Sequence, residues 1–558
     1  MEDLNNFTLV EADISEMNEQ AMIDKLNSDQ KKVFDTVTNK ITNKKEILRH
    51  FVSGTGGTGK SYLIKTLKIW IKNNLHKNVA ITALTGIAAF NVNGLTVHRL
   101  LQLPVEHKQT PKYKPLSDEV LQVLRTDLKT VELFIIDEVS MISNVTLAYI
   151  NLRLCEVFDT SDVEDGWFGK KHILVLGDLL QLPPVREKSP FEKLTPSEIN
   201  KLIGSLSIPN LWAELFTYDE LTLNMRQLDD STFVEMLKRI KVGVTTQSDR
   251  DILSNRLIPL LSHSNKGRLM EIAQCLRDLP EDTVCLLPTR NMCMQLNDAM
   301  LKAIPHPEMK LVAKDSLDCS KCMITKARAC LQKYEDDASV TAGLEETIII
   351  KEGAKVMLRR NIDVSLGLVN GSIGVVQKVR WDPEDRTKPE QLVVKFANNL
   401  IHELLPIKSK FEIIPRAYVY REQFPICVAY ALTIHKSQGL SLKNALMDIG
   451  TSIFTCGQAY VALSRVTNLH GVHLINVDFK SLKAQASAIT EYNRLRRKYR
   501  ADLSEIKPSK PSKSINNERE WAIRKTVATV QELEPEKKNR KNCNNKKTTP
   551  KKKKKCVK

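Results

Sequence analysis

The sequence predicts an α/β protein whose core is a parallel β-sheet. Three short, apolar, β-branched segments are typical of strands buried on both faces, namely Val79–Leu84, Val131–Ile136 and Ile173–Leu176. Segments long enough for crossover helices lie between them, and polar or glycine-containing sequence follows each strand directly. Because ligands bind beyond the carboxyl ends of the strands in such sheets, these polar residues are placed for chemistry.

A second α/β region begins after Arg226. Its expected strands are Val284–Leu287 and Ile426–Leu432. The sequence between them is rich in β-forming residues, with LVNGSIGVV as a turn, and we expect a small inserted β-barrel at about residues 377–424. From Lys507 onward the sequence is low in complexity, charged and interrupted by proline, which predicts a disordered tail.

The composition is that of a large globular protein. With 558 residues, 42% of them hydrophobic, the chain can bury sizeable cores, which excludes wholesale disorder. No apolar run approaches the roughly 18 residues that a membrane span needs, and the acidic first residues lack an apolar signal core. We therefore expect a protein that is neither membrane-embedded nor secreted.

The eleven cysteines are scattered along the chain, which is typical of a reducing compartment. Cys319 and Cys322 form the only CxxC pair. A structural zinc site normally has four well-spaced ligands, and the sequence offers no second pair. Free thiols are therefore favoured over a metal site.

Positive charge is concentrated at the end of the chain. The 83 Lys and Arg residues against 66 Asp and Glu residues give +17, and residues 537–558 hold 12 basic residues with no acidic one, which leaves 17 − 12 = +5 elsewhere. The ending PKKKKKC resembles a nuclear import signal and also a tether for nucleic acid; the alternative is a solvated end without a partner. On this basis we expect a nuclear protein, and otherwise a cytoplasmic one.

The strongest single motif is FVSGTGGTGKS, which fits the phosphate-binding pattern G-x-x-x-x-G-K-[ST]. A strand precedes it and an amphipathic helix follows, so backbone N–H groups and the positive helix end both face a phosphate. In this pattern Lys60 reaches the β- and γ-phosphates and the Ser61 hydroxyl helps to hold Mg²⁺. The predicted loop comprises Gly54, Thr55, Gly56, Gly57, Thr58, Gly59, Lys60 and Ser61.

Polar side chains at the ends of the next strands suit nucleotide hydrolysis. Asp137 and Glu138 follow a buried strand, where Asp137 is placed to hold Mg²⁺ through water and Glu138 to orient the attacking water. Gln181 follows the next strand, and its amide can sense a γ-phosphate by donating one hydrogen bond and accepting another.

Three further polar residues have two interpretations each. Arg226 and Arg465 can serve as arginine fingers that supply charge to the transition state, although a single arginine is more often a solvated surface residue. Gln30 can read adenine from the first helix or merely cap that helix. The positions of these residues relative to the other motifs decide between the interpretations.

Seven segments occur here in one order: GTGGTGKS, TALTGIAAFNVNGLTVHRL, IIDEVSMI, LGDLLQLPPV, LNMRQ, AYALTIHKSQGLSL and AYVALSRV. Together they resemble the motif series of superfamily 1 helicases, and most closely the PIF-type (petite integration frequency) DNA helicases, which are relatives of RecD. TIHKSQG and LVNG discriminate far better than the phosphate-binding loop. The resemblance covers about Leu26 to Phe479 and extends to viral and transposon-borne relatives.

The resemblance implies two RecA-like lobes with parallel sheets and with ATP and Mg²⁺ between them. The implied organisation is a polar lead at residues 1–25, a first lobe at 26–230 with a wedge insertion at about 103–117, a second lobe at 231–500 with the β-barrel insertion, and a basic tail at 501–558.

The resemblance also implies roles for single residues. Gln30 matches the adenine-reading glutamine, Asp137 and Glu138 the Mg²⁺ and water-activating pair, Gln181 the γ-phosphate sensor, and Arg226 and Arg465 the arginine fingers. The family's first strand-contacting motif contains Thr85, Gly86 and His98. Its later motif, which touches both nucleic acid and nucleotide, contains Thr433, His435, Lys436 and Gln438. For His98 a packed, hydrogen-bonded histidine is an equal alternative.

The expected function is that of an ATP-dependent 5′-to-3′ DNA helicase that translocates on single-stranded DNA and opens partly duplex DNA in replication, repair or recombination. With only 6% aromatic residues, we expect phosphate contacts to dominate DNA binding. One alternative is a translocase or RNA-directed motor that rarely unwinds DNA. Another is a nonenzymatic adaptor on a P-loop fold, against which the intact set of ATP-site residues argues.

Overall fold

The computed structural model describes residues 19–507 with short internal gaps. The gaps are residues 44–45, 86–87, 90–91, 105–109, 205–207, 227–229, 263, 334–340, 342–343, 361, 364–365, 367, 369–371, 385–388, 397–398 and 415–416. Gly86, the first 18 residues, part of the predicted wedge and the tail from residue 508 therefore lie outside the described residues.

The first sheet has six parallel strands in the order β3-β2-β4-β5-β1-β6, which confirms the predicted parallel α/β fold. The strands are β1 (Arg49–Gly54), β2 (Asn78–Ala83), β3 (Leu95–Thr96), β4 (Val131–Asp137), β5 (His172–Gly177) and β6 (Thr217–Leu221). Its helices include α1 (Glu19–Asp24), α2 (Ser28–Asn43), α3 (Lys60–Leu75), α5 (Val97–Leu100), α6 (Asp118–Leu128), α7 (Asn144–Phe158), α8 (Pro196–Glu198) and α9 (Leu211–Leu215).

Two hydrophobic layers cover this sheet because successive strand residues face opposite sides. Leu133 and Ile135 of β4 pack with α2 and α3, whereas Phe134 and Ile136 of the same strand pack with α7 and α9. Burial on both faces explains the continuous apolar sequence of β4. It also fixes the polar residues that follow the strands at one edge of the sheet.

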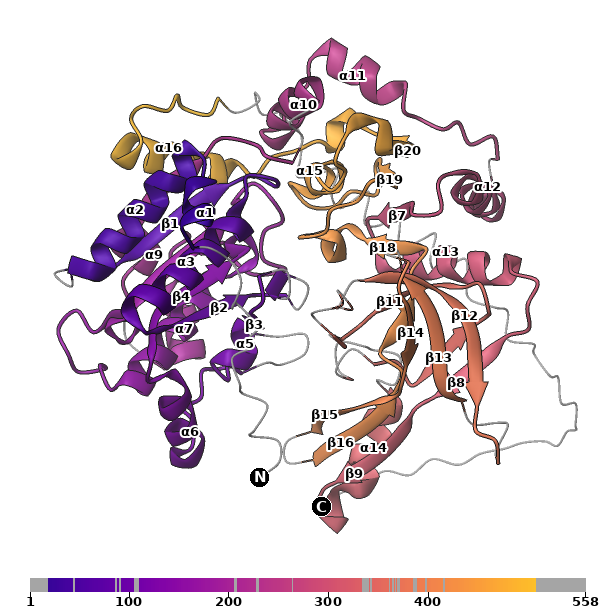
Figure 1. Cartoon of the computed structure of the whole chain (residues 1–558), viewed down its shortest axis with the longest axis horizontal. Helices are drawn as coiled ribbons and strands as arrows, with labels where there is room; N and C mark the ends of the chain where they lie inside the picture. The colour runs from indigo at the N-terminus through magenta and orange to yellow at the C-terminus, as the bar shows by residue number, and fades with distance from the viewer. Residues whose placement is uncertain are drawn as a thin grey trace, which may run out of the picture. The chain divides into compact units, whose positions relative to one another are not determined.

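The second sheet has four parallel strands in the order β18-β7-β19-β20. These are β7 (Val284–Leu287), β18 (Ala431–Thr433), β19 (Ala445–Ile449) and β20 (Val472–Val477). The accompanying helices are α10 (Ser231–Lys241), α11 (Gln247–Ser254), α12 (Asn265–Asp278), α13 (Arg290–Ala303) and α15 (Gln458–Leu463) (Figure 1).

The segment Ile426–Leu432, predicted as one strand, is divided between two sheets. Residues Ile426–Val428 form β17, which pairs antiparallel with β11 (Lys355–Leu358), whereas β18 pairs parallel with β7. The prediction of a single strand is wrong because an unbroken apolar run shows that its residues are buried but not which strands they pair with.

The antiparallel strands begin well before the predicted insertion at residues 377–424. A five-stranded sheet has the order β14-β13-β12-β11-β17, a three-stranded sheet the order β15-β16-β9, and β10 pairs with β8. The strands are β8 (Met309–Val312), β9 (Lys314–Asp318), β10 (Thr347–Ile350), β12 (Ile373–Trp381), β13 (Pro389–Phe396), β14 (Ile401–Leu404), β15 (Ile407–Ile414) and β16 (Ala417–Gln423), with α14 at Ile324–Lys333.

Strand pairing does not close these sheets into the predicted barrel among the described residues. Arg421, whose side chain is 0% exposed, joins β16 to β9 by bonding both carboxylate oxygens of Asp315, at 2.8 and 2.6 Å. The two strands lie about a hundred residues apart in the chain, and sequence alternation carries no information on such distant pairing.

The last helix, α16 (Ala486–Tyr499), belongs to the core of the first lobe, although the predicted limits place it in the second (Figure 1). Ile489, Tyr492 and Leu495 pack with Trp212 and other residues of that core. Their spacing of three and three marks one buried helix face but does not indicate which core receives it. None of the described helices is both long and apolar enough to cross a membrane.

Candidate nucleotide site and nucleic-acid channel

The phosphate-binding loop joins β1 directly to α3. Gly57 and Gly59 adopt φ angles of 91° and 76°, a left-handed backbone that favours glycine. A side chain at Gly59 would also collide with the amide of Gln30. These two glycines therefore allow the tight loop and the close approach of α2.

The Lys60 ammonium lies at the mouth of this loop. Its Nζ donates to the carbonyl oxygens of Gly54, at 2.8 Å, and Thr55, at 3.2 Å. Thr58 closes the loop through its hydroxyl, which donates to the same Thr55 carbonyl at 3.0 Å. The lysine is thus held within the loop that the sequence assigns to phosphate.

Two carboxylates follow β4 at the floor of the same cavity. The Asp137 carboxylate accepts a hydrogen bond from the Glu138 backbone N–H at 2.9 Å, and both side chains are buried. Burial, and next the negative charge of Glu138, raise the pKa of Asp137 to about 7. Such an acidic pair favours a cation beside it, and Ser61 lines the cavity with both carboxylates.

Gln438 links the two lobes at this point. Its Nε2 donates to Oε2 of Glu138 at 3.0 Å and to Oε1 of Gln181 at 3.2 Å, and it lies 3.4 Å from Oγ of Ser140. Gln438 ends a short 3₁₀ turn of the second lobe (η6, Ile434–Ser437), and its neighbour Gly439 lines the nucleotide cavity. The resemblance places Gln438 in a motif that touches both nucleic acid and nucleotide, and the structure adds its direct bond to the Glu138 carboxylate.

Arg226 and Arg465 meet above Gly56. Arg226 follows β6 on the first lobe, and its Nη1 donates to the Ser464 carbonyl of the second lobe at 3.1 Å. Arg465 is buried at the end of α15 and bonds Ser464 through Nη2 at 2.9 Å. Only Arg465 comes from the opposite lobe. Burial, and next the charge of Arg465, lower the pKa of Arg226 to about 10.

Gln30 touches the loop from α2 rather than the cavity. Its Nε2 donates to the Thr58 carbonyl at 3.0 Å, and its Oε1 accepts from the Asn27 backbone N–H at 3.1 Å. It therefore both caps its own helix and braces the phosphate loop. Its predicted contact with adenine stays a prediction.

The nucleotide cavity measures about 540 Å³ and gathers the predicted catalytic residues. It is lined by Gly56, Gly57, Gly59, Lys60, Ser61, Ala88, Asp137, Glu138, Gln181, Met225, Arg226, Gly439, Leu440, Ser441 and Arg465. The site is thus built from seven separate chain segments whose proximity in space the sequence order does not reveal.

A second cavity, of about 900 Å³, contains most of the predicted strand-contacting residues. We call it the basic channel, and its lining includes Thr85, Arg186, Arg290, Arg359, Arg360, Thr433, His435, Lys436, Gln438 and Phe454. Burial, and next the charge of Arg359, lower the pKa of Lys436 and of Arg360. This concentration of positive charge fits a polyanion.

His98 does not line either of these two cavities. It lies in the four-residue helix α5, and burial lowers its pKa, with Glu187 opposing the shift. Its predicted contact with the strand stays a prediction.

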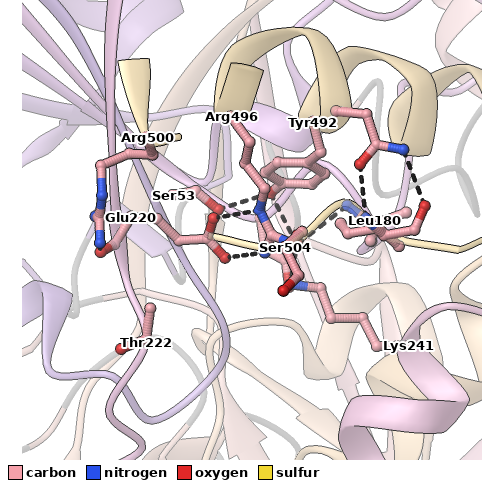
Figure 2. Close-up of polar contacts among 12 residues, drawn as sticks. Ser53, Leu180, Glu220, Thr222, Lys241, Tyr492, Arg496, Arg500 and Ser504 are labelled. Carbon is pink, nitrogen blue, oxygen red and sulfur yellow. Dashed lines mark hydrogen bonds and ion pairs between the residues drawn. The ribbon is translucent and has the colours of Figure 1, made fainter. Parts of the chain in front are cut away.

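A buried polar cluster beside the nucleotide site was not indicated by the sequence (Figure 2). The hydroxyl of Tyr492 lies 2.8 Å from Oγ of Ser53 and 3.1 Å from Oδ1 of Asp178, and it accepts from the Leu179 N–H at 3.0 Å. Asp178 is 0% exposed and pairs with Lys241 at 3.0 Å. Ser53 precedes the phosphate loop, so α16 supports that loop from behind.

The same helix is anchored at the edge of the first sheet. Arg496 bonds both carboxylate oxygens of Glu220, at 2.9 and 2.6 Å, and Arg500 bonds Asp219 at 2.6 Å. Figure 2 shows Tyr492 and Arg496 of α16 lying near Ser53 of β1 and Glu220 of β6, with Arg500 just past the end of the helix. The sequence only weakly indicates these contacts, because basic residues at the end of a helix are equally typical of a helix end exposed to solvent.

The cysteine pair shows no metal site. Cys319 is half-buried and Cys322 is exposed, both as free thiols. Over the part of the chain that the structure describes, no three His, Cys, Asp or Glu side chains gather in a way that would hold a metal ion.

Family models and known sequences that match this chain include PIF1-type helicases. Residues 25–251 match the PIF1-like helicase family, and residues 345–379 match the DNA helicase Pif1 2B domain. The ATP-dependent DNA helicase PIF1 of Xenopus laevis is 27% identical over 455 residues, which is 80% of this chain and 62% of the relative. The uncharacterized protein 030L of Invertebrate iridescent virus 6 is 26% identical over 531 residues, 82% of this chain and 93% of the relative. The chain thus spans about three fifths of the cellular relative but nearly all of the viral one.

Solved structures share the fold. The Pif1 helicase from Candida albicans has a TM-score of 0.65 at 24% identity, covering 84% of this chain and 99% of that one. Bacteroides Pif1 bound to ssDNA has a TM-score of 0.58 at 22% identity, covering 85% and 97%. The two-lobed architecture expected from the sequence agrees with these neighbours.

Proposed function

We propose that this chain is a PIF1-like, ATP-dependent helicase that moves 5′ to 3′ on single-stranded DNA and unwinds duplex DNA. The observation that carries the proposal is Gln438, which lines the basic channel and also bonds Glu138 and Gln181 in the nucleotide cavity. DNA as the partner is supported by relatives named ATP-dependent DNA helicase and by the neighbour bound to ssDNA.

The hydrolytic step follows from the residues around the phosphate loop. Glu138 orients a water molecule and accepts its proton as the new bond forms to the γ-phosphorus. The bond from that phosphorus to the β–γ bridging oxygen breaks, and ADP and phosphate result. Lys60, Arg226 and Arg465 offset the charge that develops on the phosphate oxygens. Ser61 and Asp137 would hold Mg²⁺, which supplies further positive charge at the β- and γ-phosphates.

Movement follows from the two sides of the nucleotide cavity. A bound γ-phosphate is contacted by Lys60 of the first lobe and Arg465 of the second, so ATP favours the closed arrangement. Hydrolysis removes those contacts and allows the lobes to separate. Because Gln438 extends between the cavity and the channel, each opening alters the grip on the strand. Alternate gripping by the two lobes then gives directed steps.

The proposed setting is DNA replication, repair or recombination in the nucleus. The support is the basic sequence PKKKKKC near the end of the chain, which suits either nuclear import machinery or DNA phosphates. Removing residues 537–558 should abolish nuclear accumulation of a fluorescent fusion in cells. Unchanged accumulation would refute the nuclear assignment and leave the motor assignment intact.

The direct test uses duplexes with a single-stranded overhang at either the 5′ or the 3′ end. The wild-type protein should unwind only the 5′-tailed duplex when ATP is supplied, and Lys60→Ala and Glu138→Gln should unwind neither. Glu164→Gln, which alters an exposed carboxylate outside both cavities, is the matched control and should unwind normally. Unwinding from the 3′ tail, or ATP turnover stimulated by RNA alone, would overturn the proposal.

A further inference from the structure

Phe454 is a large apolar side chain exposed within the basic channel. It is 61% exposed, and it lines the cavity that also contains Arg359 and Lys436. Its ring lies nearly parallel to that of His435, with 5.7 Å between the ring centroids and 10° between the planes. A single exposed phenylalanine is ordinary on a protein surface. A phenyl ring that stacks on a second ring inside a positively charged cavity suits a ligand with a flat aromatic face.

The loop that carries Phe454 is fixed by hydrogen bonds at both ends. The Phe454 backbone N–H donates to Oε1 of the buried Gln458 at 3.2 Å. Upstream, the Gly450 N–H donates to Asp448 at 2.9 Å, and the Ser452 hydroxyl donates to the same carboxylate at 3.1 Å. The ring is thus presented by an ordered loop, which lowers the entropic cost of stacking a ligand on it.

His435 supports one face of the phenyl ring. It belongs to η6, the same turn that leads to Gln438. Burial, and next the nearby Arg290, lower the pKa of His435, so the imidazole is neutral at physiological pH. Phe454 keeps 61% of its surface exposed despite this contact, and it lines the channel. A phosphate group cannot stack on an aromatic ring, whereas every nucleobase has a π-face that can.

We propose that Phe454, backed by His435, is a stacking platform for one nucleobase of the bound strand. The inference rests on the proposed nucleic-acid motor and deepens it, because it adds a base contact to a channel whose other partners suit phosphates. Stacking tolerates any base, so the platform serves a motor that must move along every sequence. It also places the strand beside the turn that reaches Glu138 through Gln438.

The test measures binding of two oligonucleotides of equal length by fluorescence anisotropy. One is oligothymidylate, and the other has the same phosphates but abasic sugars. Wild-type protein should bind the intact strand about 5- to 150-fold more tightly, the range expected for stacking one base. Phe454→Ala should remove most of that preference, and Phe454→Trp should retain it. Leu261→Ala is the matched control, since Leu261 is 81% exposed and outside the channel.

Salt dependence separates stacking from charge. Phe454→Ala should leave the slope of log affinity against log salt unchanged, because every phosphate contact remains. Arg359→Ala should reduce that slope and weaken both oligonucleotides equally. If Phe454→Ala keeps the wild-type preference for the intact strand, the stacking inference is overturned while the motor stands. If wild-type protein binds neither oligonucleotide, the proposed function fails and the inference fails with it.

Discussion

Replacing Tyr492 by Phe removes a single hydroxyl from the polar cluster behind the phosphate loop. The ring keeps its place in the core of the first lobe, so no cavity of consequence forms. What is lost is the shared partner of Ser53, Asp178 and the Leu179 N–H. All of these groups are buried, and water cannot easily replace the missing oxygen.

The magnitude follows from the partners that are left behind. A buried N–H without an acceptor costs about 1–3 kcal/mol, and a hydrogen bond to a carboxylate contributes about 1.5–3 kcal/mol. Asp178 keeps its ion pair with Lys241 and its hydrogen bond from the Leu180 N–H, so losing the bond from Tyr492 costs an energy at the low end of that range. Adding the two contributions gives an expected destabilisation of about 2.5–4.5 kcal/mol for Tyr492→Phe.

Urea unfolding of the full chain, followed by fluorescence, measures this effect as a lower midpoint for the transition of the first lobe at an unchanged slope. Tyr499→Phe is the matched control on the same helix, since its half-buried hydroxyl makes one bond, to the Phe216 carbonyl at 3.3 Å. That change should cost about 0.5–1.5 kcal/mol. Equal midpoints for the two variants would refute the reasoning that Tyr492 supports the phosphate loop through its hydroxyl.

Two further predictions concern stability. Asp315→Ala leaves the buried Arg421 guanidinium without its carboxylate partner and should cost about 3–5 kcal/mol, seen as faster amide exchange in β9 and β16. The control Asp318→Ala breaks an exposed ion pair and should cost under about 1 kcal/mol. Similar exchange in both variants would contradict this account. Burial lowers the pKa of His50 from 6.5 to about 4, so the unfolded chain binds its proton first and stability falls as pH drops through that interval. The difference in pKa, 6.5 − 4 = 2.5, at 1.36 kcal/mol each, predicts a loss of about 3 kcal/mol that His50→Asn should lack, and equal acid sensitivity of the two proteins would count against it.

The sequence was most informative where chemistry demands particular residues at fixed spacing. The loop from Gly54 to Ser61, the pair Asp137–Glu138 and Gln181, the predicted sensor, all line or border one cavity, as the strand ends predicted. These motifs can be predicted because each depends on residues close together in the sequence: a strand, a turn and the residues that follow the turn. The strand Val284–Leu287 was placed within its observed limits for the same reason.

Contacts between segments that are distant in the chain cannot be predicted from local sequence patterns. Tyr492 reaches Ser53 over more than four hundred residues, and nothing in either local sequence indicates the other. Phe454 lies in a short loop whose sequence carries no motif, and only its position in the channel makes it notable. Ile426–Leu432 shows the same limit, because hydrophobicity predicts burial but leaves the pairing partner undetermined.

The central claim is that strand binding and ATP turnover are coupled through Gln438. The most direct measurement is ATP hydrolysis by Gln438→Ala with and without single-stranded DNA, alongside DNA affinity of the same preparation. The account predicts that the stimulation of turnover by saturating DNA falls far more in the variant than its basal turnover or its affinity for DNA. Full stimulation of Gln438→Ala by DNA would contradict the account, because the bonds from Gln438 to Glu138 and Gln181 would then carry no coupling.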